Sequence, residues 1–559
     1  MNKKFKMEFS IFVMGAFIAI VGVLFLIARS DVVLTLRYFN ETSEQPVLRQ
    51  EVKADTKRPS YLVLTGKDQP ELHESVAKRL ELMGKTVEVR SISSFKTETD
   101  LSDYTSVIVA TEQLNLLEEP DTMLQFVKEG GSIFLAVRPS PGSALTEFYE
   151  ALGIMKASKL IETSGIQLEQ LFFGDQGDLA FQAESIKNSS LSVKLSDDAK
   201  LLASTSSGTP LLWNNLYGGG TFTVFNGTML SDMTNHALFV KGIQRSTDHV
   251  IMPIVNAHIT ELSGFPFFVA DGRDLSPAYS NHDYYRKVIW PELQRIESKY
   301  DLNYTASYLG MEDAMLSDEQ PSFMLDELQL YSRELLRMGG EIAVQESPST
   351  TAEQAAHSRE NSMKQIEEAL PGYSIRSLVS STPTTDLSLV EDVSAILMPN
   401  KYVEKKKKTV ILPKIAEGFI LNEDSKWKLF NSVASNGFYS HSLYPYRFIE
   451  EGDAEGKIAA FASFQESIQK QIPWIRSLTL SKTADAASTY INSELYEEQK
   501  GDTLTFHATT MKENTPTYYY FSTNRNVLES ENCEVEKIGE DLYLIAANEL
   551  TFSLVMGGV

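Results

Sequence analysis

Short apolar runs alternate with amphipathic segments in the first third of the chain. Segment 71–82 places Leu72, Val76 and Leu80 on one face of a helix, and Gly84 follows it as a stop signal. The apolar runs around this helix have the length of buried strands and cover residues 61–64, 86–89, 107–110 and 133–137. The alternation predicts an α/β domain over residues 59–245, with a doubly wound parallel sheet between helices.

The pattern continues with longer helical segments from residue 246 to residue 484. Apolar runs that predict strands lie at residues 266–270, 302–308, 342–344, 375–379, 395–398, 410–412 and 437–441. Amphipathic runs that predict helices lie at residues 284–300, 323–337, 352–370 and 425–434. This order predicts a closed or partly closed (β/α) barrel whose functional residues follow the strands. Residues 485–559 have short strand-like runs and predict a small β-sandwich.

A long apolar run from Phe9 to Ala28 follows three lysines within the first six residues. As a helix it is long enough to cross the ~30 Å hydrocarbon core of a membrane. No small-x-small cleavage site follows, which favours an uncleaved signal anchor. The lysines place the N-terminus in the cytoplasm. We therefore expect a single-pass protein of the cell membrane, with a tip and transmembrane anchor in residues 1–31, a stalk in residues 32–58 and an extracellular remainder.

The charge balance narrows the classes of partner. Acidic residues outnumber basic ones by 75 to 51, for a net charge of −24. Nucleic acid needs a basic face, so this balance excludes it as the expected partner, whereas it permits a cationic polymer. The one cysteine, Cys533, excludes an internal disulfide framework. The lysine run 405–408 is far along the chain from the anchor, and we interpret it as a solvated loop.

Two glycine-containing segments bear on the first α/β domain. The triplet Gly218–Gly220 lies between strand-like runs, which predicts a hairpin turn in place of a phosphate-binding loop. Phe225-Asn226-Gly227 would end a late strand, as in the class I glutamine-amidotransferase-like fold that this domain resembles. That family uses a cysteine nucleophile. No cysteine precedes Cys533, so the resemblance does not extend to the activity.

Three segments of the second unit carry a resemblance to another family. Phe268-Val269-Ala270-Asp271-Gly272 stands where polysaccharide deacetylases have TFDDG. The sequence GGEIAVQESPS, residues 339–349, follows the pattern GxEIxxH(S/T)xxH until its histidines. Phe438-Tyr439-Ser440-His441 corresponds to a late LxxH motif. The second unit therefore resembles polysaccharide deacetylases of the NodB-like type, which remove acetyl groups from amino sugars on a partial (β/α) barrel.

The resemblance implies which groups this chain lacks. In the family, one carboxylate and two imidazoles hold a divalent cation, and a second carboxylate is the general base. Asp271 stands at the metal carboxylate, but Ala270 replaces the base, and Gln345 and Ser349 replace the imidazoles. An amide and a hydroxyl are poor substitutes for imidazole. We therefore expect no catalytic residues and no cofactor, and interpret the barrel as a pseudoenzyme.

The residues left near the strand ends allow other interpretations. Asp271 with His282 or His441 is an alternative set of ligands for one divalent, zinc-like metal, in a divergent deacetylase or glycan hydrolase. Glu341 could instead face solvent, and His282 could cap the helix that starts near Asp283. The residues that we expect to line a cleft or bind glycan are Asp271, Asp274, His282, Glu341, Gln345, Glu346, His441, Tyr444 and Arg447.

The order of anchor, amidotransferase-like domain, deacetylase-like barrel and β-domain resembles an uncharacterised family of membrane-anchored proteins from exopolysaccharide loci of Gram-positive bacteria. These loci are similar to the Pel cluster, whose biofilm polymer is a partly deacetylated amino sugar. The resemblance implies a non-catalytic accessory protein with two kinds of partner, a cationic, amino-sugar-rich exopolysaccharide and membrane synthase subunits. The alternatives are the divergent enzyme and a structural scaffold of the synthase complex.

Overall fold

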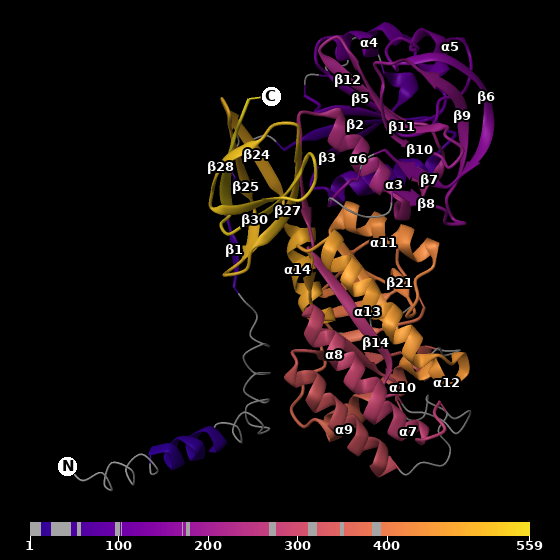
Figure 1. Cartoon of the computed structure of the whole chain (residues 1–559). Coiled ribbons are helices and arrows are strands. Elements are labelled where there is room, and N and C mark those ends of the chain that lie inside the picture. The colour runs from indigo at the N-terminus through magenta and orange to yellow at the C-terminus, as the bar shows by residue number, and fades with distance from the viewer. Residues whose placement is uncertain are drawn as a thin grey trace, which may run out of the picture.

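The computed structural model has three folded regions that contact one another (Figure 1). It describes residues 13–23, 46–52, 58–95, 101, 103–169, 171–174, 179–267, 275–310, 321–346, 352–382 and 393–558. An N-terminal α/β domain lies at one end of the molecule and a barrel at the other (Figure 1). A C-terminal sandwich touches both, through the ion pair between Lys241 and Asp541 on one side and through helix α14 (Leu480–Asn492) on the other.

The N-terminal domain has one sheet in the order β3-β2-β4-β5-β12-β11-β10-β7-β8. Its parallel part consists of β3 (Thr86–Ser91), β2 (Ser60–Thr65), β4 (Ser106–Ala110), β5 (Ser132–Leu135) and β12 (Gly220–Phe225). The antiparallel part consists of β11 (Pro210–Tyr217), β10 (Lys200–Ser204), β7 (Ile166–Leu168) and β8 (Ala180–Phe181).

Helices cover both faces of this sheet, as the alternation predicts. Helices α3 (Pro70–Leu82) and α6 (Ala237–Ser246) bury Leu72, Val76 and Leu238 in one cluster. Helix α4 (Pro120–Lys128) buries Met123 in a second cluster that forms on the other face. A separate two-stranded ribbon, β6 (Ile154–Ser164) with β9 (Lys187–Leu195), packs at the edge.

The predicted glycine hairpin is confirmed. Strands β11 and β12 are antiparallel, with Tyr217 opposite Gly220. Gly218 has a φ of +66°, and a Cβ there would lie 2.6 Å from the Cα of Lys128. The turn therefore requires glycine for its backbone conformation and for its approach to helix α4.

The barrel sheet runs in the order β19-β20-β18-β17-β16-β15-β14-β22-β21, and all of these strands are parallel except β19. Its strands are β14 (Ala257–Phe265), β15 (Tyr304–Tyr308), β16 (Glu341–Gln345), β17 (Ser377–Val379), β18 (Ala395–Met398), β19 (Glu404–Lys406), β20 (Thr409–Pro413), β21 (Ala416–Glu417) and β22 (Phe438–Leu443). A short strand, β23 (Arg476–Ser477), also pairs with β14.

One continuous segment joins the two ends of the curved sheet. Strand β20 pairs with β18, and β21 pairs with β22 a few residues later. Ser440 Oγ donates a hydrogen bond to the carbonyl oxygen of Pro413, with 2.8 Å between the two oxygen atoms. The barrel is thus partly closed at the carboxyl ends of its strands, in agreement with the predicted architecture.

The first barrel strand lies upstream of the predicted one. We expected residues 266–270, but β14 ends at Phe265. Its polar residues Thr260, Glu261 and Ser263 lie inside the barrel wall and interrupt the apolar run that a buried strand normally shows. The rest of the predicted strand, residues 268–270, lies outside the described residues.

Alternate residues of the strands face two different cores. Ile259 and Ala343 pack inside the barrel with α14, whereas Leu262 and Ile342 pack outside against the surrounding helices. These outer helices are α8 (Trp290–Tyr300), α9 (Pro321–Arg337), α10 (Ala352–Ala369) and α13 (Ala454–Gln471). A further helix, α11 (Glu423–Asn436), packs between the barrel and the N-terminal domain.

Helix α14 closes the amino end of the barrel. Leu480, Ala484 and Ala487 lie in the same core cluster as the inward residues of the strands. The helix also contacts β26 (Thr510–Lys512) and β27 (Thr517–Thr523) of the sandwich. It therefore separates the barrel interior from the sandwich.

The sandwich has two four-stranded sheets, and its strands come from both sides of the barrel in sequence. One sheet contains β13 (His249–Ile254), β27, β30 (Leu542–Ala547) and β29 (Cys533–Lys537). The other contains β24 (Leu495–Lys500), β25 (Thr503–Ala508), β31 (Thr551–Met556) and β28 (Val527–Glu531). Strand β1 (Val47–Arg49), from the predicted stalk, pairs with β26.

The predicted membrane anchor lies partly outside the described residues. Its described part, residues 13–23, is helical. Within the described residues, every helix is too short or too polar to span a lipid bilayer.

Candidate functional site

The carboxyl end of the barrel contains a polar network centred on Gln345. Its Oε1 atom accepts hydrogen bonds from Ser263 Oγ at 3.1 Å, from Gly264 N at 2.7 Å and from Ser307 Oγ at 3.1 Å. Three neighbouring strands, β14, β15 and β16, supply these groups. In the resemblance to deacetylases Gln345 occupies an imidazole position, and here its carbonyl is fully used by the barrel wall.

A buried carboxylate lies below this network. Ser307 Oγ shares its single proton between Gln345 Oε1 and Glu261 Oε1, and the Glu261 side chain is fully buried. Glu261 Oε2 and the hydroxyl of Ser442, its register partner on β22, are buried with no hydrogen-bond partner among the described residues. Buried polar atoms are normally paired, so these two can receive a water molecule or a hydroxyl group of a ligand.

The next layer toward the mouth combines a lysine, a tyrosine and a glutamate. Lys414 Nζ donates to Tyr444 OH at 3.4 Å, and that hydroxyl donates to Glu417 Oε1 at 2.8 Å. The Lys414 side chain is only 5% exposed. Burial and the nearby carboxylates of Glu261 and Glu417 raise the pKa of Tyr444, so its hydroxyl remains protonated near neutral pH.

An aromatic ledge forms the rim above this layer. The Arg447 guanidinium lies 4.5 Å from the ring centroid of Tyr444 and 5.8 Å from that of Tyr446. The Tyr446 ring in turn covers Gly264, where a Cβ would lie 2.5 Å from Tyr446 Cδ1. Gly264 also has a φ of +72°, so glycine is needed for this close contact. Aromatic rings beside charged and polar groups are suited to stack on sugar rings.

Glu341 has a structural role at the opposite end of the same strand. Its carboxylate accepts from Ser377 Oγ at 2.6 Å and from Ser481 N at 2.9 Å. Ser481 lies in the first turn of α14, whose backbone N–H groups attract negative charge. The expectation that Glu341 faces solvent is wrong, because the side chain caps this helix from inside the barrel.

His441 points away from the cleft in which we expected it. The ring contacts Phe461 and Phe464 of α13 on the outer side of the barrel, and Nε2 lies 2.6 Å from the carbonyl oxygen of Gly418. Burial lowers the pKa of His441 to about 4, so the ring is neutral. The alternation of strand β22 explains the correction, because Ser440 and Ser442 take the inward positions.

Two other predicted residues also lie outside the barrel interior. Glu346 follows β16 and pairs with Arg359 of α10, with 3.2 Å between Oε1 and Nη1 and both side chains buried. His282 lies in α7 (Asn281–Tyr284), and its Nε2 atom is 3.8 Å from Glu327 Oε1 on α9. The helix is capped by Ser280, which accepts from Asp283 N, so the capping role expected for His282 is wrong.

The predicted site is therefore brought together only in part. Gln345, Tyr444 and Arg447 lie in the cleft at the carboxyl end of the barrel. The side chains of Glu341, Glu346, His282 and His441 lie elsewhere. Asp271 and Asp274, with Ala270 and Ser349, lie outside the described residues. Within the described ranges, no group of three or more His, Cys, Asp or Glu side chains could hold a metal ion.

Sequence reasoning missed Glu261, Ser263 and Ser307. A signal existed in Thr260-Glu261-Leu262-Ser263-Gly264, which has the outer threonine and glycine of TFDDG and ends the first barrel strand. Ser263 and Gly264 of this segment donate to Gln345. In this alignment Leu262 and Ser263 stand at the two aspartate positions.

The N-terminal domain has a smaller polar cluster at the carboxyl edge of its parallel strands. Arg138 Nη1 pairs with Glu112 Oε2 at 2.8 Å, and Gln69 Nε2 donates to Glu112 Oε1 at 2.9 Å. Asp68 accepts from Thr111 Oγ1 at 2.6 Å. These groups hold the loops after β2, β4 and β5 together, and this domain has no cysteine, because the one cysteine of the chain is Cys533.

A family model matches residues 32–187, 175–346 and 398–544, which together cover most of the chain. The chain belongs to the family described as an uncharacterised protein conserved in bacteria (DUF2194). No curated protein matches it.

Several solved structures match parts of the chain. A protein described as a glycoside hydrolase/deacetylase from Parabacteroides distasonis is 10% identical, with a TM-score of 0.31, over 48% of this chain and 82% of that one. A glutamine amidotransferase from Thermotoga maritima is 12% identical, with a TM-score of 0.19, over 34% of this chain and 84% of that one.

A β-galactosidase from Bacillus circulans sp. alkalophilus is 14% identical, with a TM-score of 0.25, over 36% of this chain. The match covers 34% of the β-galactosidase, so this chain spans about a third of the length of that enzyme. TM-scores this low do not establish a shared fold, and the architecture described above rests on the strands and helices themselves.

Proposed function

We propose that this protein is a membrane-anchored, extracytoplasmic accessory protein of exopolysaccharide synthesis or export, whose barrel binds a glycan at its mouth without cleaving it. The supporting observation is the state of Gln345. Its carbonyl accepts three hydrogen bonds from the barrel wall, where a metal-dependent deacetylase needs an imidazole lone pair directed at a metal.

The rest of the mouth supports binding. The Tyr444, Tyr446 and Arg447 ledge offers aromatic rings, and Glu261 Oε2 and Ser442 Oγ are polar atoms that a sugar hydroxyl could satisfy. The net charge of −24 favours a polymer that carries free amines. The anchor, the cell-surface location and the synthase partners remain proposals from the sequence.

The test uses the full chain in a neutral detergent and glucosamine oligomers with and without N-acetyl groups. We expect binding by calorimetry, weaker binding at higher salt for the deacetylated oligomer, and no release of acetate. Tyr446→Ala should weaken binding about tenfold through lost stacking. Tyr217→Ala, a half-buried tyrosine in the N-terminal domain, is the matched control and should bind as the wild type does.

Two outcomes would overturn this proposal. Catalytic release of acetate would favour the divergent deacetylase. Absence of oligomer binding would leave the scaffold, which predicts that the chain purifies with synthase subunits even when glycan synthesis is blocked.

A further inference from the structure

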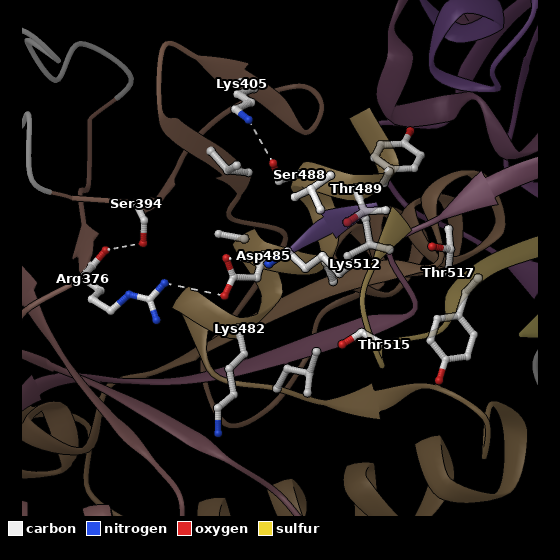
Figure 2. A pocket seen from close by; sticks show the side chains of 18 of the residues that line it. Arg376, Ser394, Lys405, Lys482, Asp485, Ser488, Thr489, Lys512, Thr515 and Thr517 are labelled. Atoms are coloured by element: carbon white, nitrogen blue, oxygen red, sulfur yellow. Dashed lines mark hydrogen bonds and ion pairs between the residues drawn. The ribbon is translucent and has the colours of Figure 1, made fainter. Parts of the chain in front are cut away.

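A pocket of about 1030 Å³ lies at the amino end of the barrel, between helix α14, the β19–β20 hairpin and the sandwich (Figure 2). This is the end opposite the glycan site proposed above. Residues before β17, β18 and β14 form its barrel wall, and residues of β26 and β27 form its sandwich wall. The pocket is thus built by two domains and by a helix that contacts both.

Cationic side chains dominate the lining. Among the residues that the structure describes, the lining has one carboxylate, that of Asp485, and seven lysines and arginines: Arg376, Lys405, Lys407, Lys408, Arg476, Lys482 and Lys512. The chain as a whole has the opposite balance, with 75 acidic and 51 basic residues. Such a concentration of like charge costs free energy in the absence of an anion, and it attracts anions from solution.

Within the described part of the lining, Asp485 is the carboxylate that these cations share. Asp485 lies between Arg376 and Lys512, at 3.6 Å from Arg376 Nη2 and 3.1 Å from Lys512 Nζ (Figure 2). Lys405 Nζ donates to a neutral group, Ser488 Oγ, at 3.0 Å (Figure 2). One carboxylate therefore serves two cations, and a third is paired with a hydroxyl.

Arg476 is held in place independently of any ligand. Its Nε donates to the carbonyl of Asn256 at 3.0 Å, and its guanidinium lies 4.4 Å from the ring centroid of Tyr518. The lining also carries hydroxyl groups on several elements: Ser374, Ser394, Ser488, Thr489, Thr515 and Thr517. A fixed guanidinium, flexible lysines and hydroxyl donors together are the groups that proteins use to bind phosphate oxygens.

The structure also places this pocket near the start of the folded chain. Val47 of β1 lines it together with Lys405, Lys407 and Lys408. The predicted membrane span ends at Ala28, 19 residues before Val47, which is at most about 65 Å of extended chain. The exposed turn at Lys407 and Lys408 agrees with a solvated loop, and the fold places this turn beside Val47 of the predicted stalk.

We propose that this pocket is a binding site for a phosphate ester. Two sources have this chemistry, the headgroup of an anionic membrane lipid and a soluble phosphate ester. The lipid source rests on the proposed membrane anchor, whereas the soluble source does not. Binding of a lipid headgroup would orient the amino end of the barrel toward the bilayer and leave the mouth facing away from it.

The soluble arm of the test titrates the full chain, in a neutral detergent, with glycerol phosphate. Lys407→Gln together with Lys408→Gln removes two exposed charges of the pocket. Lys156→Gln together with Lys159→Gln, on the exposed ribbon of the N-terminal domain, is a control with the same change in net charge. At about fivefold per lysine, the pocket variant should bind about 25-fold more weakly than the wild type and the control.

The lipid arm places the full chain in nanodiscs of phosphatidylcholine, with or without phosphatidylglycerol. Amine acetylation, read by mass spectrometry, reports the exposure of Lys407 and Lys408. Anionic lipid should protect both lysines in the wild type and in the control variant. Arg376→Gln should weaken this protection while leaving both lysines available as reporters.

Each result has a defined meaning. Binding in either arm that is lost in the pocket variants and kept in the control supports the site and identifies its source. No glycerol phosphate binding together with no protection by anionic lipid overturns it, as does equal loss in the pocket and control variants. Neither readout depends on glycan, so failure of the proposed glycan binding would leave these results unchanged.

Discussion

The two ends of the barrel differ in how their polar groups are paired. At the carboxyl end, Gln345 accepts three hydrogen bonds, and Tyr444 is linked to both Lys414 and Glu417. At the amino end, the described pocket lining has seven cationic side chains and one carboxylate, that of Asp485. Most polar groups at the carboxyl end, where α/β barrels usually place their chemistry, form hydrogen bonds within the protein. The amino end has an excess of positive charge.

This difference shows that a site's position in the fold does not by itself indicate its function. A group that catalyses or binds strongly must keep an atom available for the ligand. The side-chain carbonyl of Gln345 accepts hydrogen bonds from the barrel strands, whereas the pocket's cations share one carboxylate and a few hydroxyls. Helix α14 separates the two ends, so variants on either side of it can test the comparison.

The largest effect is expected for Glu341→Ala. This change removes the acceptor for Ser377 Oγ and Ser481 N and the negative charge at the start of α14. The free energy of unfolding should fall by about 3 kcal/mol, measured by denaturant unfolding. Because α14 carries Lys482 and Asp485, glycerol phosphate binding should weaken as well.

Glu341→Gln is the matched control for this prediction. It keeps one carbonyl acceptor and should lose about half as much stability. If Glu341→Ala unfolds as the wild type does, the carboxylate does not hold the helix in place.

A smaller effect is expected for Gln345→Ala at the carboxyl end. Three buried donors would lose their shared acceptor, and the free energy of unfolding should fall by about 2 kcal/mol. Ser263→Ala removes one of those donors and should cost about 1 kcal/mol. A stable Gln345→Ala protein with unchanged unfolding would mean that the network is not committed, which would remove the contrast between the two ends.

Acid should destabilise the protein through its buried histidines. The folded pKa of His441 is about 4, below the ordinary value of 6.5, because burial disfavours the charged ring. The folded state therefore binds this proton less readily than the unfolded state does. The stability is fully present above pH 6.5 and is lost as the pH falls from 6.5 through 4.

The His441 contribution to the free energy of unfolding should fall by about 1.5 kcal/mol between pH 7 and pH 5. His236 and His258, each with a pKa of about 3, add to the loss in the same direction. His441→Gln should reduce the pH dependence, whereas His357→Gln, on the exposed side of α10, should leave it unchanged. A His441 that binds zinc would instead make the free energy of unfolding respond to a chelator at neutral pH.

The smallest effect on stability is expected at the pocket. Lys407→Gln with Lys408→Gln should change the free energy of unfolding by less than about 0.5 kcal/mol, because the removed charges are exposed and mutually repulsive. The same variant should show the large loss of phosphate ester binding described above. A large loss of stability would instead indicate that the lysines have a structural role. The polar groups at both ends of the barrel would then stabilise the fold.

Much of the fold followed from local patterns. The alternation of apolar and amphipathic runs predicted strands β2, β3 and β4 and helix α3 closely, since β2 and β4 are buried apolar runs and α3 buries one apolar face. The same reasoning missed β14, because its inward Glu261 and Ser263 are polar although buried. A buried polar layer has no periodic apolar signal, so the sequence pattern failed where the candidate site begins.

Side-chain direction also escaped the sequence. Gln345 and Glu346 are adjacent, yet one faces the barrel interior and the other pairs with Arg359 outside. His441 and Ser442 divide in the same way. A shift of one residue reverses the face, and a motif matched by spacing alone cannot fix the register of a strand.

The sequence by itself determined the mixed α/β class, the glycine hairpin and the loss of imidazole at Gln345, because these follow from local residue types. Only the tertiary structure decided which polar groups form hydrogen bonds within the protein and which charged side chains lie close together. Glu341 meets α14, and Val47 meets the lysine hairpin, from positions far apart in the chain. Such long-range contacts depend on how the domains pack, since burial and electrostatic energies depend on distance in space.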